Sequence, residues 1–99
     1  MKLNFKENLI TLDSTPFINE DETPMTLKNV SLLALTGIHS SDDKRTTKEK
    51  IEIYTLARKV ANEEELNIEE IALLKERISL IYVSPVIVGR AFDIIEGNA

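Results

Sequence analysis

The stretch from residue 67 to residue 96 constrains the fold most, because it carries two helix signals and more apolar surface than one buried face needs. Ile71, Leu74, Ile78 and Ile81 share one face of a predicted helix over residues 67–82. Leu66, Leu73 and Leu80 recur at seven-residue intervals on nearly the opposite face. A helix that is apolar on two sides must be packed on two sides, either inside its own domain or against a partner.

The second apolar seam is our candidate for a partner-binding surface. Ile87 and Ile94 broaden the apolar stripe of the helix that follows, so the surface would extend over the last two helices. Its predicted residues are Leu66, Leu73, Leu80, Ile87 and Ile94. We expect a homodimer or higher oligomer, or another protein docked there. The alternative is that the N-terminal hairpin or the first helix covers this side and makes the seam core.

Helix start and stop signals predict the rest of the architecture. Thr26, Thr46, Asn67 and Ser84 can each cap a helix, and Gly37 and Gly97 stand where left-handed stops are expected. Residues 1–25 read as a β-hairpin around a turn at residues 13–16. The predicted fold class is therefore α+β, mainly α, with an N-terminal β-hairpin (1–25) followed by a bundle of about four helices (26–99). We identify no internal repeat.

Composition excludes several classes of protein. Ninety-nine residues, 42% of them hydrophobic, suit one folded domain over residues 1–99 and are too apolar for intrinsic disorder. The chain has no cysteine, which excludes disulfides and thiolate zinc sites. No run is long enough to span a membrane and no signal peptide is recognisable, so we expect a cytoplasmic protein without membrane contact.

Catalytic groups are scarce. The single histidine, His39, lies near Ser40, Ser41, Asp42 and Asp43, but a catalytic triad is normally assembled from separate elements rather than from neighbours on one loop. The three glycines are isolated, so no phosphate-binding loop is present. We therefore expect no enzyme activity, no cofactor and no metal site. Close helix packing would explain Gly89 inside a helix, and snorkelling or a salt bridge to Asp93 or Glu96 would explain Arg90.

Nucleic-acid binding is the alternative function. The predicted helix over residues 46–61 carries Lys48, Lys50, Arg58 and Lys59 and would be the element that contacts nucleic acid. The formal net charge of −5 argues against it, because the long-range field repels phosphates unless the cations cluster.

Four segments together resemble small proteins of tailed bacteriophages and prophages, and they span nearly the whole chain. The segments are residues 12–17 (LDSTPF), 25–30 (MTLKNV), 67–75 (NIEEIALLK) and 86–92 (VIVGRAF). Such proteins often have a glycine where this chain has Ser14. The resemblance implies a phage gene product that acts inside a bacterial cell. We expect a noncatalytic protein that binds another protein, as a virion assembly chaperone, an adaptor or an inhibitor of a host protein.

Overall fold

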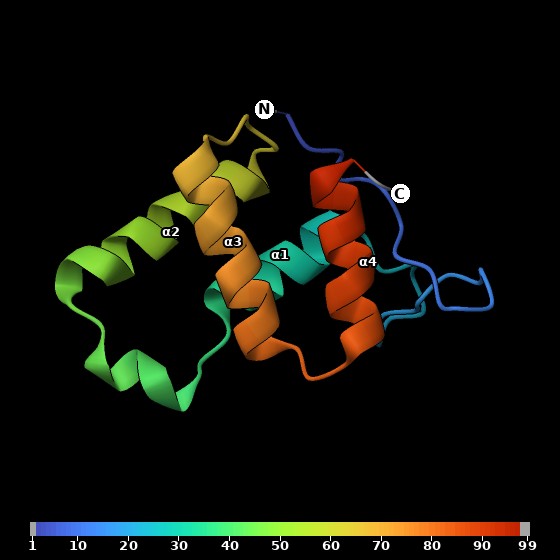
Figure 1. Ribbon diagram of the computed structural model, residues 1–99, viewed down its shortest axis with the longest axis horizontal. Coiled ribbons are helices and arrows are strands. Elements are labelled where there is room, and N and C mark those ends of the chain that lie inside the picture. The colour runs from blue at the N-terminus through green and yellow to red at the C-terminus, as the bar shows by residue number, and fades with distance from the viewer. Residues whose placement is uncertain (1, 98–99) are drawn as a thin grey trace.

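The computed structural model describes residues 2–97 and is mainly helical (Figure 1). Its α-helices are α1 (Leu27–Thr36), α2 (Thr47–Ala61), α3 (Ile68–Ile81) and α4 (Pro85–Glu96), and a 3₁₀ helix, η1 (Ser40–Lys44), joins α1 to α2. The prediction of a mainly helical protein with about four helices is confirmed. In the part of the chain that the structure describes, no helix is long and apolar enough to cross a membrane.

The helix ends follow the predicted capping chemistry with one exception. Thr26, Thr46 and Asn67 each form a capping box, and Ser84 caps α4 with Pro85 in its first turn. Gly97 has a φ of 76° and ends α4 in the left-handed conformation, as predicted. Gly37 has a φ of −66° and is extended, so its prediction as a left-handed stop is wrong.

The predicted β-hairpin over residues 1–25 is not confirmed. Instead of a sheet, the described residues form three isolated bridges, Asn8 with Thr26, Ile10 with Pro16, and Ile18 with Pro24. Tight turns interrupt the extended chain after a few residues, which leaves no strand long enough to pair along its length. Figure 1 shows this irregular segment beside α4.

A tandem eight-residue repeat explains these turns and corrects the expectation of no repeat. Residues 9–16 (LITLDSTP) and 17–24 (FINEDETP) have isoleucine, aspartate, threonine and proline at matching positions. The two copies make the same turn, because Ser14 and Glu22 occupy the same position and have φ values of 65° and 69°. The main-chain bonds match as well: Thr11 N donates to Thr15 O as Asn19 N donates to Thr23 O.

A closed ring of main-chain hydrogen bonds links Leu9 and Phe17, which start the two copies, to Met25, which follows the second copy. Phe17 N donates to Leu9 O (3.0 Å), Met25 N donates to Phe17 O (2.8 Å), and Leu9 N donates to Met25 O (2.8 Å). Each member is therefore both a donor and an acceptor within the ring. This arrangement folds the 17-residue span from Leu9 to Met25 back onto itself without a sheet.

The N-terminal segment also completes the start of α1. The N–H groups of the first helical turn have no partner inside a helix. Here Leu27 N donates to Glu7 O and Lys28 N to Phe5 O, both at 2.9 Å. Because Phe5 and Leu9 are almost fully buried against the helices, the segment belongs to the core rather than to an appended hairpin.

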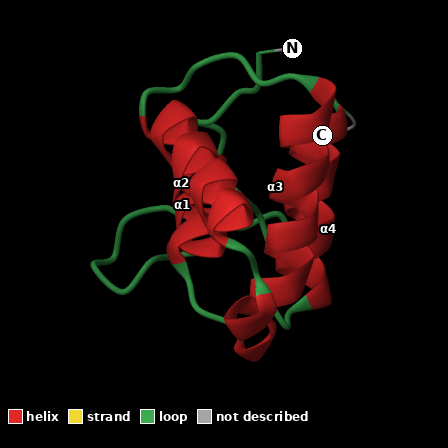
Figure 2. Cartoon of the chain, turned by 90° about the vertical axis from the view of Figure 1, so that its left-hand side faces the viewer, coloured by secondary structure: helices red, strands yellow, loops and turns green. Residues whose placement is uncertain are grey.

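α1 is the central helix of the molecule. Figure 2 shows α1 and α2 on one side and α3 and α4 on the other. α1 packs against the three other α-helices, and its Leu27, Val30 and Ala34 are fully buried. Ser31 is buried in the same helix, and its hydroxyl has no hydrogen-bond partner among the described residues. α2 and α3 meet each other far less closely than either meets α1.

Candidate functional site

Arg77 on α3 is the largest fully buried side chain of the described residues, 1% exposed. Its Nε donates to Ala34 O (3.0 Å) and its Nη2 to Gly37 O (2.8 Å), at the end of α1. Its Nη1 donates to Asp42 Oδ1 at 2.6 Å in η1. The helical pattern did not point to Arg77, because an arginine between two apolar stripes is usually a solvated residue.

Asp42 accepts hydrogen bonds from three residues. Arg77, the backbone N–H of His39 and Arg45 donate to its carboxylate and hold the pKa of Asp42 well below its ordinary value of 3.8. Opposite charge and hydrogen bonds to the ionised form both act in this direction. Arg77 and Asp42 therefore hold the connection between α1 and η1 against α3. The hydrogen bonds of the Asp42 carboxylate all serve this structural contact.

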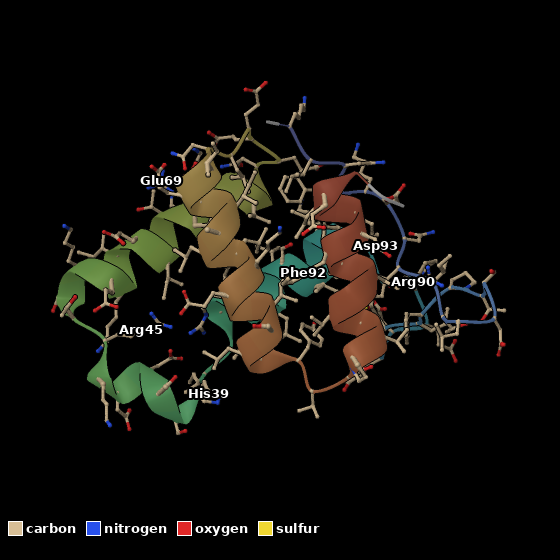
Figure 3. All side chains as sticks on the ribbon, in the orientation of Figure 1. His39, Arg45, Glu69, Arg90, Phe92 and Asp93 are labelled. Carbon is tan, nitrogen blue, oxygen red and sulfur yellow. The ribbon has the colours of Figure 1, made fainter. Side chains whose placement is uncertain are left out.

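The His39 loop does contain a serine–histidine contact. His39 Nδ1 lies 2.8 Å from Ser41 Oγ and accepts the backbone N–H of Ser41 at 3.1 Å, which is a helix-cap contact at the start of η1. The nearby carboxylate of Asp42 bonds to the backbone of His39 and to Arg77 instead of the imidazole ring. The acid that would orient the ring in a triad is thus used elsewhere. Figure 3 shows His39 at the start of η1, away from Arg90 and Asp93 on α4.

An open groove of about 500 Å³ separates α2 from α3. The buried Leu56 and the partly buried Leu73 supply its apolar lining, and Ile51 stands at its edge with 57% of its surface exposed. The remaining lining residues are Glu52, Thr55, Asn67, Glu69 and Glu70. In Figure 3, Glu69 marks the start of α3 on the side that faces α2.

Two ion pairs span the gap between α2 and α3 on either side of Leu73. Lys59 Nζ on α2 lies 2.8 Å from Glu70 Oε1 on α3. Arg45, just before α2, reaches Glu76 of α3 at 3.5 Å. Long side chains thus join two helices that do not pack closely, and the apolar lining between the pairs stays open.

Burial at Glu70 would raise its pKa, but the hydrogen bonds from Lys59 and from the backbone of Asn67 bring that pKa below its ordinary value. Glu70 is therefore ionised at neutral pH, and its contact with Lys59 holds one end of the groove.

The five residues of the predicted partner-binding seam differ in how far they are buried. Leu66 is 2% exposed and lies in the core, out of reach of a partner. Leu73 lines the α2–α3 groove, and Leu80 is partly exposed one heptad further along α3. Ile87 and Ile94 are partly buried against the core from α4. The seam is therefore not one continuous patch: Leu73 lines the α2–α3 groove, and Ile94 lines a separate cavity between α4 and residues 7–10.

The basic residues of α2 are not collected on one free face. Lys59 is paired with Glu70, and the guanidinium of Arg58 lies 5.8 Å from the ring centre of Tyr54. Lys48 and Lys50 are exposed near the start of the helix, with Glu49 between them. This arrangement adds nothing to the nucleic-acid alternative.

α4 differs from expectation at two positions. Arg90 donates to Ile10 O (3.1 Å) and Thr11 O (3.2 Å), so among the described residues it tethers the N-terminal segment instead of pairing with Asp93 or Glu96. A Cβ at Gly89 would meet no described atom within 4 Å, so close packing does not explain this glycine. Arg90 also lines a cavity of about 340 Å³ between α4 and residues 7–10.

No family model, curated protein or solved structure matches this chain. Within residues 2–97, no three His, Cys, Asp or Glu side chains are grouped so that they could hold a metal ion. Function therefore has to be argued from the surface itself.

Proposed function

We propose that this protein is noncatalytic and acts by binding a segment of another protein in the α2–α3 groove. The observation that carries the proposal is the apolar lining of the groove, where the exposed Ile51 and the partly buried Leu73 lie over the buried Leu56, between two helices that ion pairs hold together. Most apolar side chains of this size are covered in a small domain, and an open apolar groove with polar borders is typical of a binding site. The exposed Ile51 extends the apolar surface to the rim.

The resemblance to small proteins of tailed bacteriophages supports a phage or prophage setting inside a bacterial cell. Assembly chaperones, adaptors and inhibitors of host proteins all work through such a surface. Self-association is a related proposal, in which Leu80, Ile87 and Ile94 on the last two helices would meet a second copy.

Replacement of Ile51 by aspartate tests the groove without disturbing the core. Ile51→Asp should leave the free energy of unfolding nearly unchanged, because the side chain is more than half exposed. It should abolish capture of the protein partner from lysates of phage-infected bacteria, or convert an oligomer to a monomer in sedimentation. Ile38→Asp is the matched control, since Ile38 is 92% exposed and lies outside the groove.

A second variant tests the α3 part of the seam. Leu73→Gln combined with Leu80→Gln should stay folded by circular dichroism and lose the same partner. Unfolding of this double variant would assign the two leucines to the core. Retention of the partner by both the folded double variant and Ile51→Asp would refute the groove as the binding site.

A further inference from the structure

We infer that the α2–α3 groove binds an amphipathic helix whose apolar face is bordered on both sides by lysine or arginine. This inference rests on the proposed function and adds the chemistry of the partner. It comes from the distribution of charge around the groove, from the ion pairs that already use the nearby cations, and from the two-walled shape of the site.

Carboxylates line both walls of the groove and cations line neither. Glu52 stands on the α2 wall, and Glu69 and Glu70 stand on the α3 wall. Among the described residues, no lysine or arginine lines the groove. Of the three carboxylates, Glu70 is paired with Lys59, whereas Glu52 and Glu69 have no ion-pair partner within residues 2–97.

Local helix chemistry accounts for only part of this charge. Glu69 lies in the first turn of α3, where a carboxylate is favoured by the helix dipole. Glu52 lies beyond the first turn of α2 and has no such reason. Glu52 and Glu69 therefore stand on different walls of the same groove, and this favours a partner that brings positive charge to both walls.

The two cations nearest the ends of the groove already have carboxylate partners, and Lys48, one helical turn before Glu52, is exposed outside the lining. Lys59 is held by Glu70, and Arg45 is shared between Asp42, Glu49 and Glu76. On the α3 side the groove lining runs from position 67 to position 73, about 9 Å along the helix axis. This interval has room for one or two apolar side chains beside Leu73, with the partner's cations reaching Glu52 and Glu69 at the borders.

A helix presents this pattern naturally. Residues spaced three and four apart form one apolar stripe, and the positions next to the stripe point to its two sides. Grooves between helices commonly take such an amphipathic helix. An acidic helix would bring like charges to both walls.

Binding of two synthetic peptides tests the inference. The first is a fluorescein-labelled peptide of roughly 18 residues, about five helical turns, with leucine on one face and lysine elsewhere; the second has glutamate in place of lysine. Fluorescence anisotropy at about 0.1 M salt should show that the intact protein binds the lysine peptide and not the glutamate peptide.

Charge-neutral variants then locate the site. Glu52→Gln combined with Glu69→Gln should weaken binding of the lysine peptide about tenfold, as expected for the loss of two partly exposed ion pairs. Glu20→Gln combined with Glu22→Gln is the matched control, because it changes net charge equally at exposed residues outside the groove. The control should bind as the wild type does. Ile51→Ser should also weaken binding, because it removes the apolar side chain without adding a carboxylate that would attract lysine.

Several results would overturn the inference. They are failure of the lysine peptide to bind, equal binding of both peptides, and equal weakening by the groove pair and the control pair. If such a result came with loss of a cellular partner in Ile51→Asp, the groove would remain the binding site and only the partner chemistry would be wrong. A wild-type dimer that Ile51→Asp dissociates, with no peptide binding, would assign the groove to a second copy.

Discussion

Asp42→Asn should destabilise the protein strongly, because it removes the charged partner of a buried arginine. Arg77 is 1% exposed. In the variant it would keep its hydrogen bonds to the carbonyls of Ala34 and Gly37 but lose the negative charge that pairs with it. Breaking a buried ion pair at one partner costs about 3–5 kcal/mol, and the side chain of Asp42 is 22% exposed, which favours the lower end. We expect a loss of about 3 kcal/mol from a total of roughly 5–15 kcal/mol.

Urea denaturation followed by circular dichroism measures this loss. A decrease of about 3 kcal/mol should appear as a lower midpoint with an unchanged slope, and as a Tm roughly 12–24 °C lower. Asp43→Asn is the control, since Asp43 is the exposed neighbour in the same 3₁₀ helix. If Asp42→Asn costs no more than Asp43→Asn, Arg77 does not depend on Asp42 and the reasoning is wrong.

The same ion pair predicts a pH dependence of stability. Because folding lowers the pKa of Asp42, its contribution is complete above the unfolded-state pKa near 3.8 and is lost as the pH falls towards the folded-state value. The stability difference between wild type and Asp42→Asn should therefore be constant above about pH 5 and should shrink steadily below about pH 4. A difference that stays constant down to about pH 2.5 would contradict this linkage.

Four further predictions concern individual positions, and a fifth concerns the net charge. Gly89→Ala should stabilise the protein by up to about 1 kcal/mol in urea denaturation, because no described atom blocks a Cβ there; Gly37→Ala should destabilise it, because the new Cβ would lie 2.7 Å from Leu33 O. Ser31→Ala should stabilise it by about 1 kcal/mol, since the buried hydroxyl has no partner among the described residues; a loss would reveal a bond to that hydroxyl. Ile78→Ala should cost about 2–5 kcal/mol, and a loss below about 0.5 kcal/mol would place Ile78 at the surface. Duplex DNA should not bind at submicromolar concentration in physiological salt, as measured by anisotropy, because a chain of charge −5 gains little from counterion release.

The helices were predictable because their signals are local. A capping residue and its partner three positions later lie within one turn, so Thr46 with Glu49 and Asn67 with Glu70 mark helix starts without knowledge of the fold. The N-terminal segment was not predictable in the same way. Its turns depend on a positive φ at Ser14 and Glu22, and serine and glutamate are not residue types from which a positive φ is predicted.

The candidate site was predictable only in part. The seven-residue spacing predicted Leu73 as a binding residue, but it predicted the buried Leu66 in the same way. Spacing cannot tell the two apart, because burial depends on which elements cover each face. The pairing of Arg77 with Asp42 joins residues 35 positions apart and leaves no periodic signal. The eight-residue repeat was visible in the sequence as matching Thr-Pro pairs at residues 15–16 and 23–24.

The ring of main-chain bonds among Leu9, Phe17 and Met25 has a consequence for hydrogen–deuterium exchange. Each of the three residues donates its N–H to one member of the ring and accepts a hydrogen bond from the other through its carbonyl. Opening the ring at one position therefore loosens the other two. These three amides should therefore exchange at nearly the same rate, as one cooperative opening unit. Since Glu7 and Phe5 supply acceptors to the first turn of α1, the amides of Leu27 and Lys28 should share that rate, far slower than is usual for the fraying start of a helix.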